Sequence, residues 1–301
     1  MLHPTALETP ARRLSATVGT YVRLCKPRVV ELLLVTALPP MVLAARGFPA
    51  WHLVFAVLIG GALAAGGANA INCWIERDRD VLMKRTHHRP LPAGDMEPTA
   101  ALVFGIALNV VAFALLASLA NVLSAVLTLT ATLFYVFVYT IWLKPRSVQN
   151  IVIGGAAGAV PALVGWAAVT GRVSAPAWVL FLVVFAWTPA HFWALALKYR
   201  DDYAAAGIPM LPVVKGVPAT TRAIAQYAVL TVAITLMLGL VTTVGWIYVA
   251  VASVAGAAFI FGAFRLVRDA DPKRAIRFFG LSNVYLMLVF VAVAVDTLVF
   301  R

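Results

Sequence analysis

Apolar runs of about 20 residues, each long enough to cross a bilayer as an α-helix, recur along the whole of this 301-residue sequence. Of its residues, 62% are hydrophobic and only 12% are charged, whereas roughly 25% charged is usual in soluble globular proteins. The sequence therefore excludes a soluble fold and predicts an all-α, polytopic membrane bundle of about nine transmembrane helices. We place the spans at about residues 29–46, 51–73, 99–119, 121–143, 148–170, 176–197, 223–245, 246–265 and 278–299.

Lysine and arginine residues gather on one side of these spans. All but three of the 24 lie in residues 1–28 or in the segments that begin at the ends of the second, fourth, sixth and eighth spans. The three exceptions are Arg46, Arg172 and Arg301. Because Lys and Arg are retained on the cytoplasmic side of a membrane, this pattern predicts a cytoplasmic N-terminus and a C-terminus outside. The net charge of +12 follows from the same bias and from contact with the lipid bilayer, so it does not indicate a nucleic-acid partner.

The chain divides into a short tail and one large domain. Residues 1–28 include basic residues but lack the apolar core of a signal peptide, which predicts a cytoplasmic N-terminal tail. Residues 29–301 are then expected to form a single transmembrane domain, with cytoplasmic cap loops at about 74–98 and 199–222.

A polar stretch, NCWIERDRD (72–80), directly follows the second apolar run. Its residues Asn72, Glu76 and Asp80 are four apart, and such positions drift only about 80° around a helix, so they share one face while Asp78 points away. Hard cations such as Mg²⁺ take one or two carboxylates together with phosphate oxygens of a substrate. The stretch therefore predicts a metal-binding face, and the alternative is a solvated helix end whose carboxylates pair with the neighbouring arginines.

A second polar cluster ends the sixth span. His191, Lys198 and Asp202 are spaced i, i+7 and i+11, which on one helix puts them within about 40° of a single face, with Asp201 beside it. Ionisable groups in membrane spans are costly and mark functional sites by default. A lone histidine in a span is also compatible with a simple packing role, but here it begins an ionic face.

Two polar helix ends under two basic loops predict one chamber for an anionic ligand at the cytoplasmic face. Arg85, Arg89, Lys144 and Arg146 are its candidate diphosphate ligands, because Arg offers bidentate geometry to phosphate and Lys a point charge. For each of these residues taken alone, the alternative is a role in membrane topology only.

Taken together, these residues resemble the UbiA superfamily of intramembrane prenyltransferases. The resemblance narrows to one branch, the protoheme IX farnesyltransferase (heme O synthase) family. His191 and Lys198 stand where quinone-type relatives carry aspartates, and this replacement is typical of the heme-farnesylating branch. Glu76 departs from the family pattern, which usually has Asp, and this leaves its metal coordination open. The matching stretches are LCKPRVVELLLVT (24–36), NCWIERDRDVLMKRTHHRPLP (72–92), YTIWLKPRSVQNIVIGGAAGAVPALVGW (139–166) and HFWALALKYRDDYAAAGIPMLPVVKG (191–216).

The resemblance implies transfer of the farnesyl group of farnesyl diphosphate to the 2-vinyl group of heme B, which gives heme O. It implies an enzyme of the cell inner membrane with its active site facing the cytoplasm, and a heme A synthase or terminal oxidase assembly factor as a possible partner. Mg²⁺ would be held by Asn72, Glu76, Asp80 and Asp202, and Tyr135 and Tyr139 would face an allylic cation. For these two tyrosines, the alternative is anchoring at the membrane interface or helix packing. The implied catalytic residues are Asn72, Glu76, Asp80, His191, Lys198 and Asp202, and the implied substrate-binding residues are Arg85, Arg89, Tyr139, Lys144, Arg146 and Asp201.

Three roles stay open for His191 and Lys198: binding a heme propionate, ligating the heme iron, or contacting the diphosphate. Two other functions also stay open. A UbiA-type enzyme acting on an aromatic quinone precursor is disfavoured by these two residues. A transporter would place its ionisable groups near the bilayer midplane, whereas here they cluster at one face.

Overall fold

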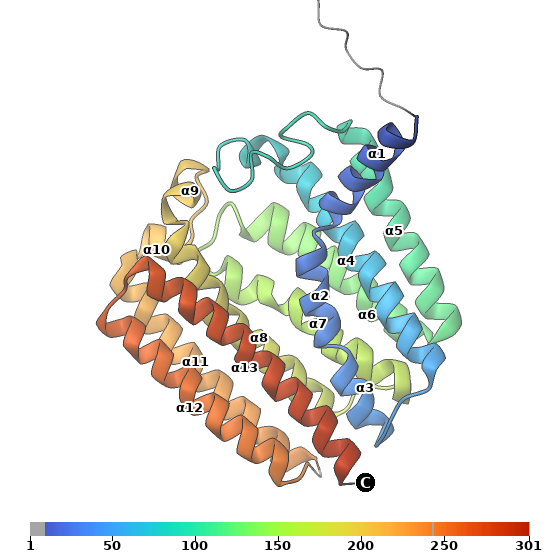
Figure 1. Ribbon diagram of the computed structural model, residues 1–301, viewed down its shortest axis with the longest axis vertical. Helices are drawn as coiled ribbons and strands as arrows, with labels where there is room; N and C mark the ends of the chain where they lie inside the picture. Colours follow the sequence, from blue (N-terminus) through green and yellow to red (C-terminus); the bar gives the residue numbers. More distant parts are fainter. Residues whose placement is uncertain (1–9, 243, 301) are drawn as a thin grey trace, which may run out of the picture.

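The computed structural model describes residues 10–242 and 244–300, and this part of the chain is helical without a strand (Figure 1). The segment Phe134–Leu143 is π-helical and continues α6 directly. The helices are α1 (Pro10–Cys25), α2 (Pro27–Val35), α3 (Leu38–Ala45), α4 (Trp51–Asp80), α5 (Pro98–Leu119), α6 (Val122–Leu133), α7 (Asn150–Thr170), α8 (Ala175–Lys198), α9 (Arg200–Ala205), α10 (Leu211–Val214), α11 (Gly216–Val241), α12 (Trp246–Arg268) and α13 (Pro272–Val299).

Within the described residues, eight helices are long and apolar enough to span a membrane, counting α6 with its π-helical continuation as one. A ninth candidate is broken: the segments Val18–Cys25 and Val30–Ala45 meet at an angle of 53°. The structure thus confirms an all-α polytopic bundle, with the first expected span in pieces. The described N-terminal end of α1 and the C-terminal end of α13 lie at opposite ends of the molecule (Figure 1).

The break between α1 and α2, just before the first expected span, has a local cause. Lys26 adopts a left-handed backbone conformation (φ 53°) immediately before Pro27, which opens α2. A residue before proline avoids the α region, and proline suits the first helical turn, so α1 must end at this point. The single span expected over 29–46 is corrected to α2 and α3, which part at Thr36 just before the Pro39–Pro40 pair.

Helix α4 is the longest element and extends its apolar span into the polar stretch, ending at Asp80. It packs closely on α5, because a Cβ on Gly105 would lie 2.8 Å from the carbonyl oxygen of Gly67. Small residues permit such close approach of helices in lipid. The spans expected from 223 and 278 also begin earlier, at Gly216 and Pro272. Hydropathy marks the lipid-facing part of a helix, while the helix itself continues through its polar ends.

The largest buried cluster joins α7, α8, α11, α12 and α13. Phe259 stacks between Phe278 and Tyr285, with ring centroids 5.2 and 4.6 Å away, and the Tyr285 hydroxyl lies 2.7 Å from the Thr235 hydroxyl. These contacts join α11 and α12 to α13, and the bond from Trp187 Nε1 to the Ser282 carbonyl at 2.9 Å joins α8 to α13. Helices α1 to α6 form the opposite side of the molecule (Figure 1). The chamber described below is lined mainly by α2, α4, α6 with its π-helical continuation, α7 and α8.

Candidate active site

A cavity of about 410 Å³ runs into the bundle beside α4. Along this helix its wall changes from Val57 and Gly61 to Asn72 and Glu76. At 1.5 Å per residue, the distance from Val57 to Glu76 is about 28 Å. The cavity is therefore apolar along most of its length and charged at one end, and we call it the chamber.

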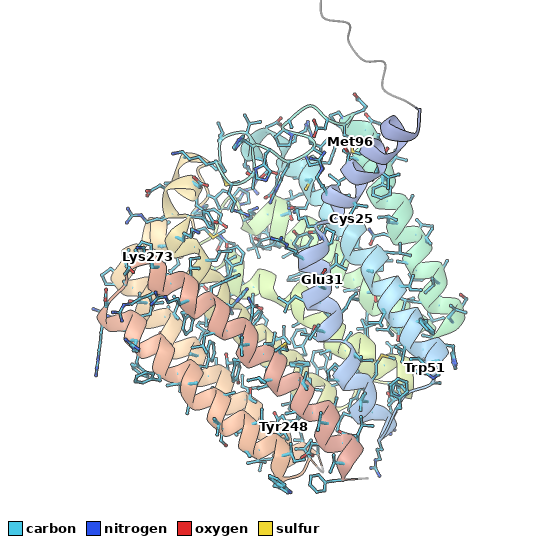
Figure 2. The ribbon with its side chains drawn as sticks, in the orientation of Figure 1. Cys25, Glu31, Trp51, Met96, Tyr248 and Lys273 are labelled. Atoms are coloured by element: carbon cyan, nitrogen blue, oxygen red, sulfur yellow. The ribbon has the colours of Figure 1, made fainter. Side chains whose placement is uncertain are left out.

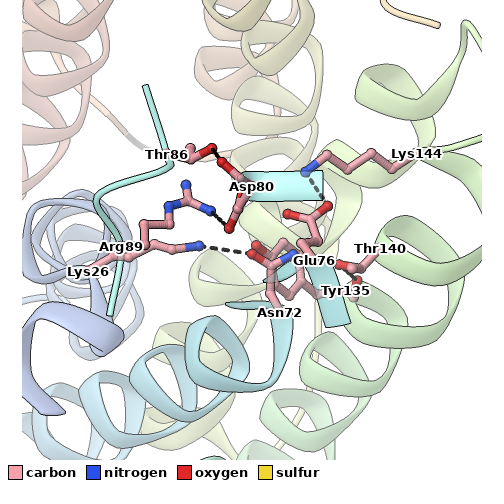
Figure 3. Close-up of polar contacts among 9 residues, drawn as sticks. All are labelled: Lys26, Asn72, Glu76, Asp80, Thr86, Arg89, Tyr135, Thr140 and Lys144. Carbon is pink, nitrogen blue, oxygen red and sulfur yellow. Dashed lines mark hydrogen bonds and ion pairs between the residues drawn. The ribbon is translucent and has the colours of Figure 1, made fainter. Parts of the chain in front are cut away.

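The three residues of the predicted metal-binding face all lie buried near the charged end of the chamber, with exposed fractions of 2% or less. Each is held by a cation from another part of the chain (Figure 3). The ammonium of Lys26 donates to Asn72 Oδ1 at 2.9 Å, and Lys144 forms an ion pair with the Glu76 carboxylate. The Arg89 guanidinium donates to Asp80 Oδ2 at 2.6 Å.

The burial pattern agrees with the expected helical face. The side chain of Asp78 is 84% exposed and lies 3.7 Å from Arg77, whereas Asn72, Glu76 and Asp80 point inward. The alternative of a solvated helix end paired with its own arginines is therefore wrong for these three residues.

Charge around Arg89 keeps that residue cationic. Burial lowers the pKa of its guanidinium, but the Asp80 carboxylate and further negative charge, including Glu76, more than offset this, so the pKa lies above its ordinary value. The ion pair joins the loop after α4 to the end of α4 itself. Thr86 strengthens the same link, since its hydroxyl donates to the Asp80 carbonyl at 2.9 Å.

The π-helical segment positions two tyrosines on the chamber wall. Its wide turn is seen in the backbone bond from the Lys144 amide to the Tyr139 carbonyl, five residues earlier, at 2.8 Å. The Thr140 hydroxyl donates to the Tyr135 carbonyl at 2.8 Å. Tyr135 and Tyr139 stack with centroids 5.4 Å apart, and the Asn72 amide donates to Thr140 Oγ1 at 3.2 Å. π-Helical turns occur frequently at functional sites. Here the widened segment places aromatic faces beside the acidic face of α4.

His191 lies on the chamber wall on α8, seven residues before the helix ends at Lys198, between the rings of Trp187 and Phe279. The two ring centroids lie 4.1 and 4.2 Å from that of the imidazole. Its Nδ1 lies 2.7 Å from the hydroxyl of Ser282 on α13. The sequence suggests an ionic face around His191, but the structure gives it aromatic and hydroxyl neighbours.

The expectation that His191, Lys198 and Asp202 share one face is wrong, because it assumed a continuous helix. The backbone of Tyr199 (φ −103°, ψ 25°) leaves the helical region, so α8 ends at Lys198 and α9 begins as a separate helix at Arg200. Lys198 is exposed, and its ammonium lies 5.2 Å from the centre of the Tyr199 ring. The Asp201 side chain is 92% exposed beside Arg200.

Asp202 joins the two cap segments, which are the loop between α4 and α5 and the segment that follows α8. Its Oδ2 accepts a hydrogen bond from the backbone amide of Arg85 at 3.2 Å. The Arg85 guanidinium lies over the rings of Tyr199 and Tyr203, 5.5 and 6.0 Å from their centres, and Arg85 and Tyr203 both line the chamber. Burial raises the pKa of Tyr203, so its hydroxyl stays protonated as a donor. Arg146, by contrast, is exposed and donates to the carbonyls of Ile141 and Trp142.

The donor set suits Mg²⁺ only in part. Asn72, Glu76 and Asp80 supply the oxygen ligands that this ion prefers, and Asp80 Oδ1 is buried without a hydrogen-bond partner. Among the described residues, however, no group of three or more His, Cys, Asp or Glu side chains lies in an arrangement that would hold a metal ion. The assignment of Asn72, Glu76, Asp80 and Asp202 as metal ligands therefore stays a prediction.

Sequence reasoning missed Lys26, Thr140, Tyr203 and Ser282 as parts of this region. Only Lys26 carried a local signal, since the Lys-Pro pair marks a break that turns its side chain toward α4. Thr140 and Tyr203 directly follow the predicted residues Tyr139 and Asp202, and Ser282 lies on α13, but hydropathy alone does not distinguish these three from packing residues.

The profile of the UbiA prenyltransferase family matches residues 33–291. The chain belongs to this family. Among relatives in the family's heme-farnesylating branch, the protein named protoheme IX farnesyltransferase 1 from Saccharopolyspora erythraea is 54% identical over 297 residues, covering 98% of this chain and 94% of its own. Protoheme IX farnesyltransferase from Gloeobacter violaceus is 49% identical over 292 residues, covering 97% and 96%.

Solved structures show the same UbiA fold at low identity. A digeranylgeranylglyceryl phosphate synthase superimposes with a TM-score of 0.76 at 17% identity, covering 93% of this chain and 98% of that one. A UbiA homolog from Archaeoglobus fulgidus bound to GPP and Mg²⁺ gives a TM-score of 0.65 at 19% identity, covering 92% and 99%. At such identities the likeness establishes the fold.

Proposed function

We propose that this chain is a membrane prenyltransferase that transfers the farnesyl group of farnesyl diphosphate to the 2-vinyl group of heme B, which gives heme O. The observation that carries the proposal is the buried acidic face of α4, matched by three cations at the charged end of an apolar chamber. An isoprenoid diphosphate has the same division into an apolar chain and a compact anionic head. The names of the relatives at about half identity support heme B as the acceptor.

The cations of the site are suited to hold the diphosphate head. Lys26, Lys144 and Arg89 now bind Asn72, Glu76 and Asp80, and a diphosphate would take over these cations. The exchange would leave the oxygens of the three α4 residues free to hold Mg²⁺, which when bound supplies positive charge against the leaving diphosphate. Arg85, whose Nε is buried without a hydrogen-bond partner among the described residues, adds a further donor on the chamber wall.

The reaction then follows from the arrangement of charges and rings. Breakage of the bond between C1 of the farnesyl group and the diphosphate oxygen leaves an allylic cation, and the fixed cations stabilise the departing anion. Tyr135 and Tyr139 present aromatic faces to positive charge on the wall of the same chamber. The vinyl group supplies the electron pair for the new carbon–carbon bond. Water then adds to the resulting cation and loses a proton, which completes the hydroxyethylfarnesyl group.

The setting of the enzyme forms part of the same proposal. The site would face the cytoplasm in the cell inner membrane, with the N-terminus inside and the C-terminus outside. Residues 29–301 would act as one catalytic domain under cap segments that Asp202 and Arg85 join. Lys198, Asp201 and Arg146, all exposed here, would reach a ligand only as it enters beside the caps. Heme O would pass to a heme A synthase or a terminal oxidase assembly factor.

The test uses purified protein in lipid nanodiscs with farnesyl diphosphate, Mg²⁺ and one acceptor at a time. With heme B, we expect diphosphate release and a product whose mass corresponds to heme O. With an aromatic quinone precursor such as 4-hydroxybenzoate, we expect neither. A prenylated aromatic product would assign the chain to the other acceptor class, and movement of substrate across the membrane without diphosphate release would favour the transporter.

A further inference from the structure

The imidazole of His191 is fixed more tightly than a packing role requires. Trp187 and Phe279 stack on its two faces, with interplanar angles of 20° and 27°. Ser282 contacts α8 twice: its hydroxyl lies 2.7 Å from His191 Nδ1, and its carbonyl accepts from Trp187 Nε1 at 2.9 Å. The position and rotation of the ring are therefore set by α13 as well as by α8.

The hydrogen bonds around Ser282 also determine which ring nitrogen carries the proton. The Ser282 hydroxyl has one hydrogen, and it donates this to the Phe279 carbonyl at 2.7 Å, because a carbonyl oxygen can only accept. The hydroxyl oxygen must then accept from His191, so Nδ1 carries the hydrogen. In a neutral imidazole the other nitrogen, Nε2, is left with a lone pair.

The surroundings favour this neutral form. His191 contacts no Asp or Glu side chain among the described residues, and two aromatic faces enclose it, so a charged ring would lack a partner. Nε2 has no hydrogen bond among those residues either, and the ring lines the chamber. His191 therefore offers an electron pair to whatever occupies this part of the chamber.

This property separates the roles that the sequence leaves open. A heme propionate or a diphosphate needs a hydrogen-bond donor, and Nε2 carries no hydrogen in this tautomer. A metal ion needs the lone pair, and histidine is a common axial ligand of heme iron. Metal-ligating histidines also usually donate their second N–H to a fixed acceptor, as Nδ1 does here to Ser282.

We propose that Nε2 of His191 binds the iron of the heme acceptor, and that Ser282 is the positioning residue that fixes the ring for this bond. The inference rests on the proposed function, because heme B is the acceptor assumed there. The bond forms by donation of the Nε2 electron pair to the iron, and no proton or electron is transferred. Iron ligation would hold the macrocycle in one place in the chamber and make iron itself a determinant of acceptor choice.

The experiment titrates the full-length protein in nanodiscs with heme B and, separately, with iron-free protoporphyrin IX. Absorbance and electron paramagnetic resonance report the iron ligand. Wild type should show a nitrogenous axial ligand, and His191→Ala should lose it and bind heme B at least about ten-fold more weakly, with added imidazole restoring the spectrum. Wild type and His191→Ala should bind the iron-free porphyrin with the same affinity. His52→Ala, which removes an exposed histidine from the first turn of α4, is the matched control and should behave as wild type.

Ser282→Ala keeps the histidine and tests its positioning. We expect heme B affinity to fall about ten-fold, with affinity for iron-free porphyrin unchanged, and Ser282→Thr to restore it. An unchanged iron spectrum in His191→Ala would overturn the inference, as would equal weakening of both porphyrins, which indicates packing alone. If wild type makes heme O while the His191→Ala spectrum is unchanged, only the ligation fails. If wild type binds heme B but never farnesylates it, the proposed function fails instead.

Discussion

Asp78 and Asp80 are two residues apart on α4 and differ almost completely in exposure. Asp80 is fully buried and bound to Arg89, whereas the side chain of Asp78 is 84% exposed. Asp80→Asn should therefore lower kcat/KM for diphosphate release by about a hundred-fold or more, because it removes a charge from the ionising site. Asp78→Asn, the same change on the same helix, should stay within about two-fold of wild type.

Both rates are measured per folded protein, with the thermal midpoint in detergent recorded for each variant. Equal losses in the two variants would contradict the assignment of the inward face as the reactive one. So would full activity in Asp80→Asn.

Lys26 is the cation that sequence reasoning missed. It lies at the break between α1 and α2, and its ammonium donates to Asn72 Oδ1 at 2.9 Å. Arg28, two residues later, is exposed. Lys26→Gln should raise KM for farnesyl diphosphate about ten-fold, since a hydrogen bond to a charged group contributes roughly 1.5–3 kcal/mol. Arg28→Gln should leave KM nearly unchanged. If only kcat falls in Lys26→Gln, the residue does not bind the ground-state diphosphate.

At the residue scale, helical spacing predicted which α4 side chains turn inward, because i, i+4 and i+8 is a property of one continuous helix. The cations opposite them were harder to assign. Charge and loop position predict Arg89, Lys144 and Arg146 alike, and the first two lie at the site, whereas Arg146 is exposed and donates to carbonyls at a helix end. Charge and sequence position alone do not distinguish a ligand from a cap.

At the scale of the elements, Asp296 on α13 completes the start of α12. Its carboxylate accepts from the backbone amides of Gly245 and Tyr248, which have no partner within their own helix. Asp296→Ala should lower the free energy of unfolding by about 2 kcal/mol, and Asp296→Asn by less, because the amide keeps an acceptor oxygen.

Activity per folded molecule should not change in either Asp296 variant. The α12 start lies at the end of the molecule opposite α9 and α10, as the position of Tyr248 shows (Figure 2). Denaturation in detergent measures the change in the free energy of unfolding. Lost turnover with unaltered stability would show that this end of the bundle is coupled to the chamber.

Three elements differ from their sequence-based description for identifiable reasons. The Lys26-Pro27 pair breaks the chain just before the first expected span, Tyr199 ends α8 before Asp201 and Asp202, and Phe134–Leu143 widens into a π-helix. An apolar run predicts that a helix exists, since length and hydropathy suffice for that. It does not predict a change of direction or of helical pitch, because those depend on contacts with other helices such as the Thr140–Asn72 bond.

At the scale of the whole molecule, the distribution of basic residues predicts the orientation in the membrane. A periplasm-dependent reporter enzyme fused after Arg301 should be active, and the same reporter inserted at the exposed Asp201 should be inactive. The opposite pattern would place the chamber mouth outside and would separate it from a cytoplasmic supply of diphosphate substrates. Activity at both positions would contradict the span count.

Mass spectrometry of hemes extracted from cells that express this chain tests the central claim most directly. Cells with the wild-type chain should accumulate heme carrying a hydroxyethylfarnesyl group, and cells that contain folded Asp80→Asn protein in the membrane should retain heme B, because that variant loses a charge at the ionising site. Unaltered heme B in cells that contain folded wild-type protein in the membrane would contradict the account.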